Sequence, residues 1–227
     1  GTLAPIQLDP TTVRIYPAAL SFFEWAAKQE GVEIALISGR DLDDLRSRTE
    51  GIDAWRSGSH GQEIEDPSGE LVVSAPPRTN DPSADWENRA GDAGLRIEKK
   101  KFGIAVHWRG VDGVDDDHPL IREFETWAKS NRLETTHGRR VIEAAVPGAS
   151  KKSVLERLVS ETGAERVVYA GDDVTDLSAI ELAANLGRGF FVKSREREAE
   201  FPSSVEVVPS TDVLLAKMKE EVLGVRP

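Results

Sequence analysis

The sequence has 227 residues, with 40 acidic and 29 basic side chains and a formal net charge of −11. This length is enough for one large domain, or for a domain with an inserted second unit. A chain this acidic is not suited to coating nucleic acid or anionic lipid. No apolar run approaches the roughly 20 residues that span a bilayer. The absence of Cys excludes disulfides, thiolate metal sites and a thiol nucleophile. We therefore expect a cytoplasmic monomer with no nucleic-acid or membrane partner.

Short β-branched runs alternate with helical patterns in the first and last parts of the chain. Helical patterns at 17–31 and 40–51 flank an apolar run at 32–39 that ends in a glycine turn. Further helices at 151–164 and 177–187 flank a buried strand at 166–173, and a short strand follows at 189–193. This order predicts an α/β, Rossmann-like fold with helices on both faces of a parallel sheet.

The middle of the chain has a different pattern. Residues 78–94 are polar and rich in turn formers, 95–111 alternate as one strand, 115–133 are helical, and 139–147 form another strand. Two strands around one helix predict a small α+β unit inserted at about 76–147. The larger core then consists of 1–75 and 148–227.

The stretch YAGDDVTDL at 169–177 places three carboxylates directly after a buried strand: Asp172, Asp173 and Asp176. In an open parallel sheet, this position is the ligand crevice at the carboxyl end of a strand. Clustered carboxylates are costly unless a positive charge lies among them, and Mg²⁺ prefers such hard oxygen ligands. The alternative is structural, because Asp173 or Thr175 can simply cap the following helix.

The stretch ISGR at 37–40 is typical of a phosphate-holding turn, since Ser38 and the backbone amides can donate hydrogen bonds together. The alternative is an ordinary strand-to-helix turn that ends in a surface Arg40.

The stretch ASKK at 149–152 places Lys151 in the first turn of a helix, with Ser150 as its N-cap. A cation is unfavourable at this end of the helix dipole, which indicates a role such as neutralising a phosphate. The alternative is a pair of solvated lysines.

Taken in order with the opening Gly1-Thr2-Leu3, these stretches resemble the motifs of the haloacid dehalogenase superfamily of phosphotransferases. In that family a first strand ends in Asp-x-Asp-Gly-Thr-Leu, where the first Asp attacks phosphorus and the second acts as acid and base. The resemblance implies Mg²⁺ as cofactor, with Asp172 and Asp173 as its ligands. It also implies a catalytic set in this chain: Thr2, Ser38, Lys151, Asp172 and Asp176.

A narrower resemblance is to trehalose-6-phosphate phosphatases. It depends on GTLAPI, SGRDL, GSHGQEI, IEKKKFGIAVHWR, RVIEAAVPGASK and GDDVTDLSAI, of which GSHG at 58–61 is the most specific. The resemblance implies that the following residues contact the substrate: Gly39, Arg40, His60, Glu98, Lys100 and Glu143. The plainer alternatives are a surface turn for His60 and a solvated strand edge for the three lysines at 99–101. Strand alternation would turn Lys100 to the opposite face from its two neighbours.

The chain departs from the family pattern at three places. Ser150-Lys151-Lys152 replaces the usual Asp-Lys-Gly, Leu177 replaces a Glu, and alanines follow Glu143 where many members carry an Arg. The missing Arg leaves the identity of the sugar open.

The family's nucleophile belongs immediately before Gly1 and is absent from this sequence. We expect a longer parent chain that carries Asp-x-Asp there. The alternative is a relative without these aspartates, which binds a sugar phosphate but does not hydrolyse it. The expected function is Mg²⁺-dependent hydrolysis of trehalose 6-phosphate through an aspartyl-phosphate. A glucosylglycerol-phosphate or mannosylglycerate-phosphate type of phosphatase is the other enzymatic candidate.

Overall fold

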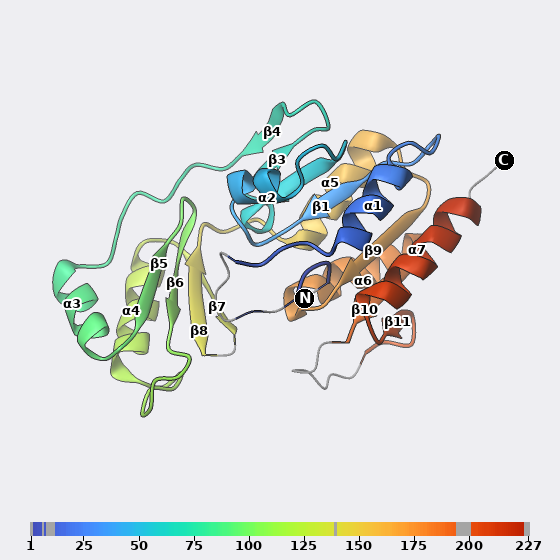
Figure 1. Cartoon of the computed structure of the whole chain (residues 1–227). Coiled ribbons are helices and arrows are strands. Elements are labelled where there is room, and N and C mark those ends of the chain that lie inside the picture. The colour runs from blue at the N-terminus through green and yellow to red at the C-terminus, as the bar shows by residue number, and fades with distance from the viewer. Residues whose placement is uncertain (1, 6, 8–11, 139, 194–200, 225–227) are drawn as a thin grey trace. The chain divides into compact units, whose positions relative to one another are not determined.

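The computed structural model describes residues 2–5, 7, 12–138, 140–193 and 201–224. Gly1, which opens the first predicted motif, lies outside these residues. The chain forms two compact units, Gly1–Val73 with Ser150–Pro227, and Ser74–Ala149 (Figure 1). We call them the core unit and the inserted unit. Within the described ranges, no helix is both long and apolar enough to cross a membrane.

The core unit is built from two stretches of chain. The first contains α1 (Pro17–Ala26), β1 (Ala35–Ile37), α2 (Leu42–Arg48), β2 (Trp55–Gly58), the 3₁₀ turn η1 (Ser59–Gly61), β3 (Glu63–Glu65) and β4 (Leu71–Ser74). The second contains α5 (Lys151–Thr162), β9 (Val167–Gly171), α6 (Val174–Leu186), β10 (Gly187–Val192), β11 (Val205–Val208) and α7 (Thr211–Gly224).

Parallel strand pairs place the functional loops of the core unit. Strands β1 and β2 are parallel, with Ile37 opposite Ser57, and β3 and β4 extend this sheet. Strands β9, β10 and β11 form a second, wholly parallel sheet. The predicted α/β class is confirmed. Because β1 and β2 are parallel and in register, the loops that follow them leave the same edge of the sheet.

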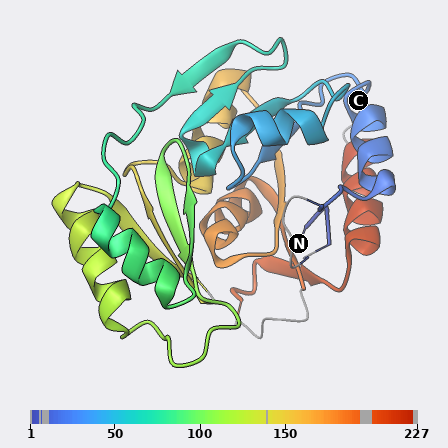
Figure 2. The same ribbon diagram turned by 60° about the vertical axis from the view of Figure 1, so that its left-hand side comes forward.

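Apolar side chains of α5 pack against strands of both sheets. Leu155 lies in a buried cluster with Tyr169 of β9. Val154 and Leu158 are buried with Ile64 of β3. Elsewhere in the core unit α1 and α7 lie side by side, as both ribbon views show, with the side chain of Leu215 among the buried residues of α1 (Figures 1 and 2). Helix α5 thus packs against both sheets, and this packing holds its N-terminus in place.

The inserted unit is a four-stranded antiparallel sheet covered on one face by two helices. Its elements are α3 (Ala84–Asp92), β5 (Arg96–Lys99), β6 (Gly103–His107), α4 (Pro119–Ser130), β7 (Glu134–Gly138) and β8 (Val141–Ala145). The strand order is β5-β6-β8-β7. Ile104, Ile142 and Ala144 face the helices and are completely buried. The residues that alternate with them point to the opposite face, which we call the open face.

Three local predictions for this unit are wrong. Residues 78–94, which read as turns, contain α3, because Ser83 caps the helix and Trp86 stacks on Phe124 with ring centroids 5.4 Å apart. The run at 95–111, which reads as one strand, is two strands joined by a tight turn at 100–102. Strand β7 was not expected. Of the three, α3 depends on a partner that is distant in sequence, whereas β5 with β6 and β7 with β8 pair across short turns.

Candidate active site

Thr2 and Asp172 meet at the carboxyl end of β9, although they are 170 positions apart. The Thr2 hydroxyl donates to Asp172 Oδ1 at 2.6 Å. The Thr2 carbonyl in turn accepts from the hydroxyl of Thr211, at the start of α7, at 2.7 Å. The first and last motifs of the sequence therefore come together.

Asp176 accepts three hydrogen bonds at this end of β9, and its side chain is only 4% exposed. Its Oδ1 accepts from Lys151 Nζ at 2.7 Å and from the Tyr169 hydroxyl at 2.8 Å. Its Oδ2 accepts from the backbone N–H of Asp173 at 3.1 Å. Burial, and then the negative charge of Asp176, raise the pKa of Tyr169 strongly, so this hydroxyl stays a neutral donor.

Gly171 lets Asp176 approach the strand. A Cβ on Gly171 would lie 2.2 Å from Asp176 Cβ and 2.3 Å from its Cγ. Any side chain here would displace Asp176 and with it the partners of its Oδ1. The glycine of GDD is therefore required by contact rather than by an unusual backbone angle.

Asp173 caps α6, which is the structural alternative raised from the sequence. Its Oδ1 accepts from the N–H of Val174 at 2.6 Å, and it shares a capping box with Asp176. A capping carboxylate still has lone pairs for a cation. The capping role therefore does not exclude a metal ligand.

The donor set at Asp172 and Asp173 fits Mg²⁺, which keeps several waters and is often held by one or two carboxylates. Within the described residues, no group of three or more acidic or histidine side chains could enclose a metal ion. Mg²⁺ at these two residues stays a prediction.

The turns after β1 and β2 interlock. The N–H of His60 donates to the carbonyl of Ser38 at 2.9 Å, and the N–H of Ser59 donates to the carbonyl of Arg40 at 2.7 Å. Ser59 and His60 both have left-handed backbone angles, with φ of 49° and 58°. A Cβ on Gly39 would lie 2.3 Å from His60 Nε2, so the imidazole lies directly against this glycine. The motifs ISGR and GSHG thus form one structure.

The side chain of Arg40 lies against α2. Its guanidinium pairs with Asp44 at 2.7 Å, and both side chains are about one third exposed. Burial works to raise the pKa of Asp44, but hydrogen bonds from Arg48 and Arg40 outweigh it and lower that pKa. Asp44 is therefore an anion that holds Arg40 beside the turn.

Helix α5 brings Lys151 to this turn. Lys151 is the first helical residue, after the N-cap Ser150, and α5 contacts the η1 turn that carries His60. Lys151 also pairs with Asp176, so α5 contacts a turn of one sheet and carries the partner of a carboxylate that follows β9 in the other. Three of the predicted motifs are therefore neighbours in the core unit.

Two side-chain pairs lie on the open face of the inserted unit. Lys100 Nζ lies 2.9 Å from Glu143 Oε1, and His107 Nε2 lies 2.9 Å from Glu98 Oε2. The hydrogen bond from His107 lowers the pKa of Glu98 although the carboxyl is partly buried. The side chain of Lys99 instead pairs with Asp81 and Glu87. The predicted substrate residues of this unit therefore gather on one face.

Comparison with known families agrees with these motifs. The trehalose-phosphatase family matches residues 1–201, which is most of the chain. This chain belongs to the trehalose-phosphatase family. The family resemblance found in the sequence is confirmed.

Most of this chain is similar in sequence to trehalose-phosphate phosphatases of mycobacteria. The protein of Mycobacterium bovis (strain BCG / Pasteur 1173P2) is 31% identical over 244 residues, which cover 98% of this chain and 61% of that protein. The protein of Mycobacterium marinum is 30% identical over 86% of this chain and 53% of its own length. The chain thus spans less than two thirds of these relatives.

Solved structures give the same fold for this family member. A trehalose-6-phosphate phosphatase related protein has a TM-score of 0.69 at 26% identity, over 99% of this chain and 95% of that one. The C-terminal domain of the Candida albicans trehalose-6-phosphate phosphatase has a TM-score of 0.69 at 20% identity, over 98% and 89%. A haloacid dehalogenase-like hydrolase from Bacteroides thetaiotaomicron has a TM-score of 0.64 at 15% identity, over 92% and 93%. The last two establish the fold alone.

Sequence reasoning on this trehalose-phosphatase family member missed two contributors to the sites. Tyr169 was quoted only as part of a strand, although a buried tyrosine hydroxyl requires a hydrogen-bond partner. His107 lies in the family stretch IEKKKFGIAVHWR but is not among the predicted substrate residues, although its alternation with Val106 places it on the face of Glu98. Catalytic and substrate-binding roles for the predicted residues stay predictions.

Proposed function

We propose that this chain is part of a phosphatase that hydrolyses trehalose 6-phosphate to trehalose and inorganic phosphate. The observation that carries the proposal is the hydrogen bond from Thr2 to Asp172, because it joins the two ends of the motif series. Membership of the trehalose-phosphatase family supports the same reaction.

Three groups of the core unit are proposed to hold the phosphoryl oxygens. The Ser38 and Thr2 hydroxyls donate hydrogen bonds, and the Lys151 ammonium supplies positive charge. Preorganised donors of this kind lower the cost of bringing a dianion to a carboxylate nucleophile. Asp176 and Tyr169 fix Lys151 in position through the bonds at 2.7 Å and 2.8 Å.

The proposed nucleophile is an aspartate that precedes Gly1 in the parent protein. Its carboxylate attacks phosphorus and forms an aspartyl-phosphate, while the sugar oxygen leaves with a proton from a second aspartate two residues later. That second aspartate then takes a proton from the water that hydrolyses the intermediate. Asp172 and Asp173 are proposed to hold Mg²⁺, which would supply charge neutralisation at the phosphoryl group.

The inserted unit is proposed to act as a cap that recognises the sugar. Glu98, Lys100 and Glu143 offer two acceptors and one donor to sugar hydroxyls on a single sheet face. Gly39, Arg40 and His60 are proposed to contact the phosphate end of the same substrate. We propose a cytoplasmic, monomeric enzyme.

A second sugar-phosphate substrate is favoured by the alanines after Glu143. Ala144 is fully buried against the helices, and Ala145 follows on the open face. A short side chain there leaves space that the longer Arg of many members would occupy. This supports glucosylglycerol phosphate or mannosylglycerate phosphate as the alternative substrate.

The test measures phosphate release by the intact parent protein and by this chain, with Mg²⁺ and each of the three sugar phosphates. Turnover of trehalose 6-phosphate by the parent, abolished by Asp172→Asn, supports the proposal. Turnover of another sugar phosphate alone supports the second candidate. If trehalose 6-phosphate raises the melting temperature of the parent without turnover, the protein is a non-catalytic sensor and the enzymatic proposal is wrong.

A further inference from the structure

The turn that carries Lys100 is fixed through its backbone carbonyls. Within residues 100–103, the N–H of Lys100 donates to the carbonyl of Gly103 at 2.9 Å, which closes the turn. The carbonyl of Lys101 accepts from the N–H of Arg78 at 3.1 Å, and the carbonyl of Phe102 accepts from the N–H of Val146 at 2.9 Å. Every carbonyl of this turn except that of Lys100 is thus bonded to a backbone N–H.

Arg78 binds the Lys100 carbonyl through its side chain. Its Nε–H is shared between the carbonyls of Lys100, at 2.9 Å, and Gly103, at 3.0 Å. Its Nη1 donates to the carbonyl of Asn80 at 2.7 Å and to the carboxylate of Asp81. The side chain is only 13% exposed, and the two bonds of its Nε–H are partly buried.

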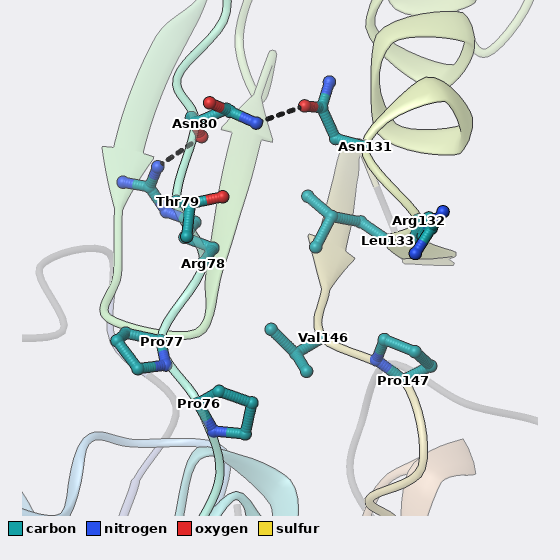
Figure 3. Close-up of a pocket in the computed structure, with 10 residues that line it drawn as sticks. All are labelled: Pro76, Pro77, Arg78, Thr79, Asn80, Asn131, Arg132, Leu133, Val146 and Pro147. Atoms are coloured by element: carbon teal, nitrogen blue, oxygen red, sulfur yellow. Dashed lines mark hydrogen bonds between the residues drawn. The ribbon is translucent and has the colours of Figure 1, made fainter.

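A small pocket of about 150 Å³ lies beside Arg78 in the inserted unit (Figure 3). The pocket is closed on one side by the hydrogen bond from Asn80 Nδ2 to Asn131 Oδ1 at 2.8 Å. Figure 3 shows the guanidinium of Arg78 turned away from Leu133 and Val146, which line the opposite wall. Arg78 thus lines the pocket, while its Nε–H is bonded to the turn.

The charged side chains around the turn have different partners, and that of Lys100 lies on the open face. Asp81 pairs with both Arg78 and Lys99, and their hydrogen bonds lower its pKa. The ammonium of Lys101 lies over the ring of Phe102, 4.9 Å from its centroid. Lys100 pairs with a group on the open face, Glu143, whereas Lys99 pairs with Asp81 and Glu87.

We propose that Arg78 is a positioning residue for substrate binding, because it holds the backbone from which Lys100 reaches the open face. The inference rests on the proposed function, in which Lys100 contacts the sugar phosphate. Without the shared Nε–H, two partly buried carbonyls lose a charged donor and the turn relaxes. Lys100 then has to be ordered by the ligand itself, which weakens binding.

The kinetic test is a double-mutant cycle in the intact parent protein. We expect Arg78→Gln to lower kcat/KM for trehalose 6-phosphate about tenfold, mainly through KM, because the loss falls on ligand binding. In a Lys100→Met background, Arg78→Gln is expected to change kcat/KM by less than about twofold, since residues that act as a unit are not additive. Arg78→Lys, which keeps the charge and one donor, is expected to recover part of the loss.

The matched control is Arg89→Gln, which removes an exposed arginine of the same unit that pairs with Asp85 and Glu123. It is expected to leave both kinetic constants unchanged. Equal losses from Arg78→Gln in the two backgrounds would indicate a general structural effect and would overturn the proposal. An unchanged kcat/KM in Arg78→Gln would do the same.

A second measurement does not depend on activity. In lysine-selective ¹³Cε NMR of this chain, the signal lost in Lys100→Met identifies Lys100. We expect Arg78→Gln to move that signal toward the position of the exposed Lys152, while Arg78→Lys moves it less. An unmoved signal overturns the proposal. If the parent releases no phosphate from trehalose 6-phosphate, the proposed function fails, and this measurement alone decides the positioning role. If Arg78→Gln does not fold, Arg78→Lys supplies both readouts.

Discussion

The core unit and the inserted unit hold their charged groups in different ways. At the end of β9, Asp176 and Lys151 have side chains 4% and 11% exposed, and Tyr169 also bonds to the carboxylate. On the open face of the inserted unit, Lys100 and Glu143 are 17% and 25% exposed and form one simple pair. Breaking a buried pair leaves an uncompensated charge, whereas a more exposed pair is exchanged at little cost. Under the proposed function, we therefore expect the pair in the core unit to stay in place when a ligand binds, and the pair on the open face to be exchanged for ligand contacts.

The largest expected effect is on kinetics, where a variant of the core unit should lower kcat and a variant of the inserted unit should raise KM. In the parent protein, Asp172→Asn is expected to lower kcat for trehalose 6-phosphate by at least about 10³-fold, because one of the two proposed Mg²⁺ ligands is lost. Glu143→Gln is expected to raise KM about tenfold with little change in kcat, since it removes binding that is the same in ground and transition states. Steady-state kinetics of both variants, with Arg89→Gln as control, distinguishes them. A loss of kcat in Glu143→Gln as large as that in Asp172→Asn contradicts this division.

The second effect concerns stability. Asp176→Asn is expected to lower the free energy of unfolding by about 3–5 kcal/mol, because Lys151 loses its partner while buried. Glu143→Gln, which breaks the more exposed pair, is expected to cost less than about 1 kcal/mol. Urea unfolding of this chain measures both. Similar losses in the two variants would show that burial does not distinguish the pairs.

The third effect uses one glycine from each unit. Gly171→Ala is expected to destabilise the chain by about 1–3 kcal/mol, because its Cβ would overlap the Asp176 side chain. Gly91→Ala, near the C-terminal end of α3, meets nothing within 4 Å and is expected to stabilise by about 0.5–1 kcal/mol. Thermal melting shows the opposite signs. Stabilisation by Gly171→Ala would mean that Asp176 has room to move.

The smallest effect is a pH dependence in the inserted unit. The hydrogen bond to Glu125, and then that to Asp116, raise the pKa of His137 against the opposing effect of burial. A pKa raised in the folded state contributes stability below the unfolded pKa, and this contribution is lost as pH rises through the folded value.

We therefore expect His137→Gln to lower the free energy of unfolding at about pH 5.5 and to leave it unchanged at about pH 8.5. The loss at the lower pH is expected to be less than about 1 kcal/mol, because the groups are exposed. Unfolding at both pH values checks this. Glu125→Gln is the matched variant and should remove part of the same pH dependence. A loss that is larger at the higher pH would give His137 the opposite sign.

The spacing of apolar residues and the positions of glycines predicted the strands and helices whose ends they mark. The buried strand before Asp172 and the helices around it were found because apolar runs and glycines mark their ends. Helix α3 was missed because Trp86 and Ala90 are its only buried residues, and their partners lie on α4 and the sheet. The turn after Lys99 was missed because three lysines continue the alternation of a strand.

The site was predictable in its members but not in its contacts. The motif spacing identified Lys151 and Asp176 separately, yet their ion pair joins residues 25 positions apart and exists only in the folded chain. The same holds for Tyr169, whose hydroxyl meets Asp176 only because Gly171 lets that carboxylate approach.

The first and last segments of the inserted unit lie next to each other. Pro76 and Pro77, near its beginning, line one small pocket together with Val146 and Pro147, near its end. Both segments are bonded to the single turn that follows β5. A module whose two ends are neighbours can be excised from a surface loop, or transplanted into another, without stretching either chain. Under the proposed function, exchange of such a module between genes would change the molecule that is recognised and leave the host's chemistry intact.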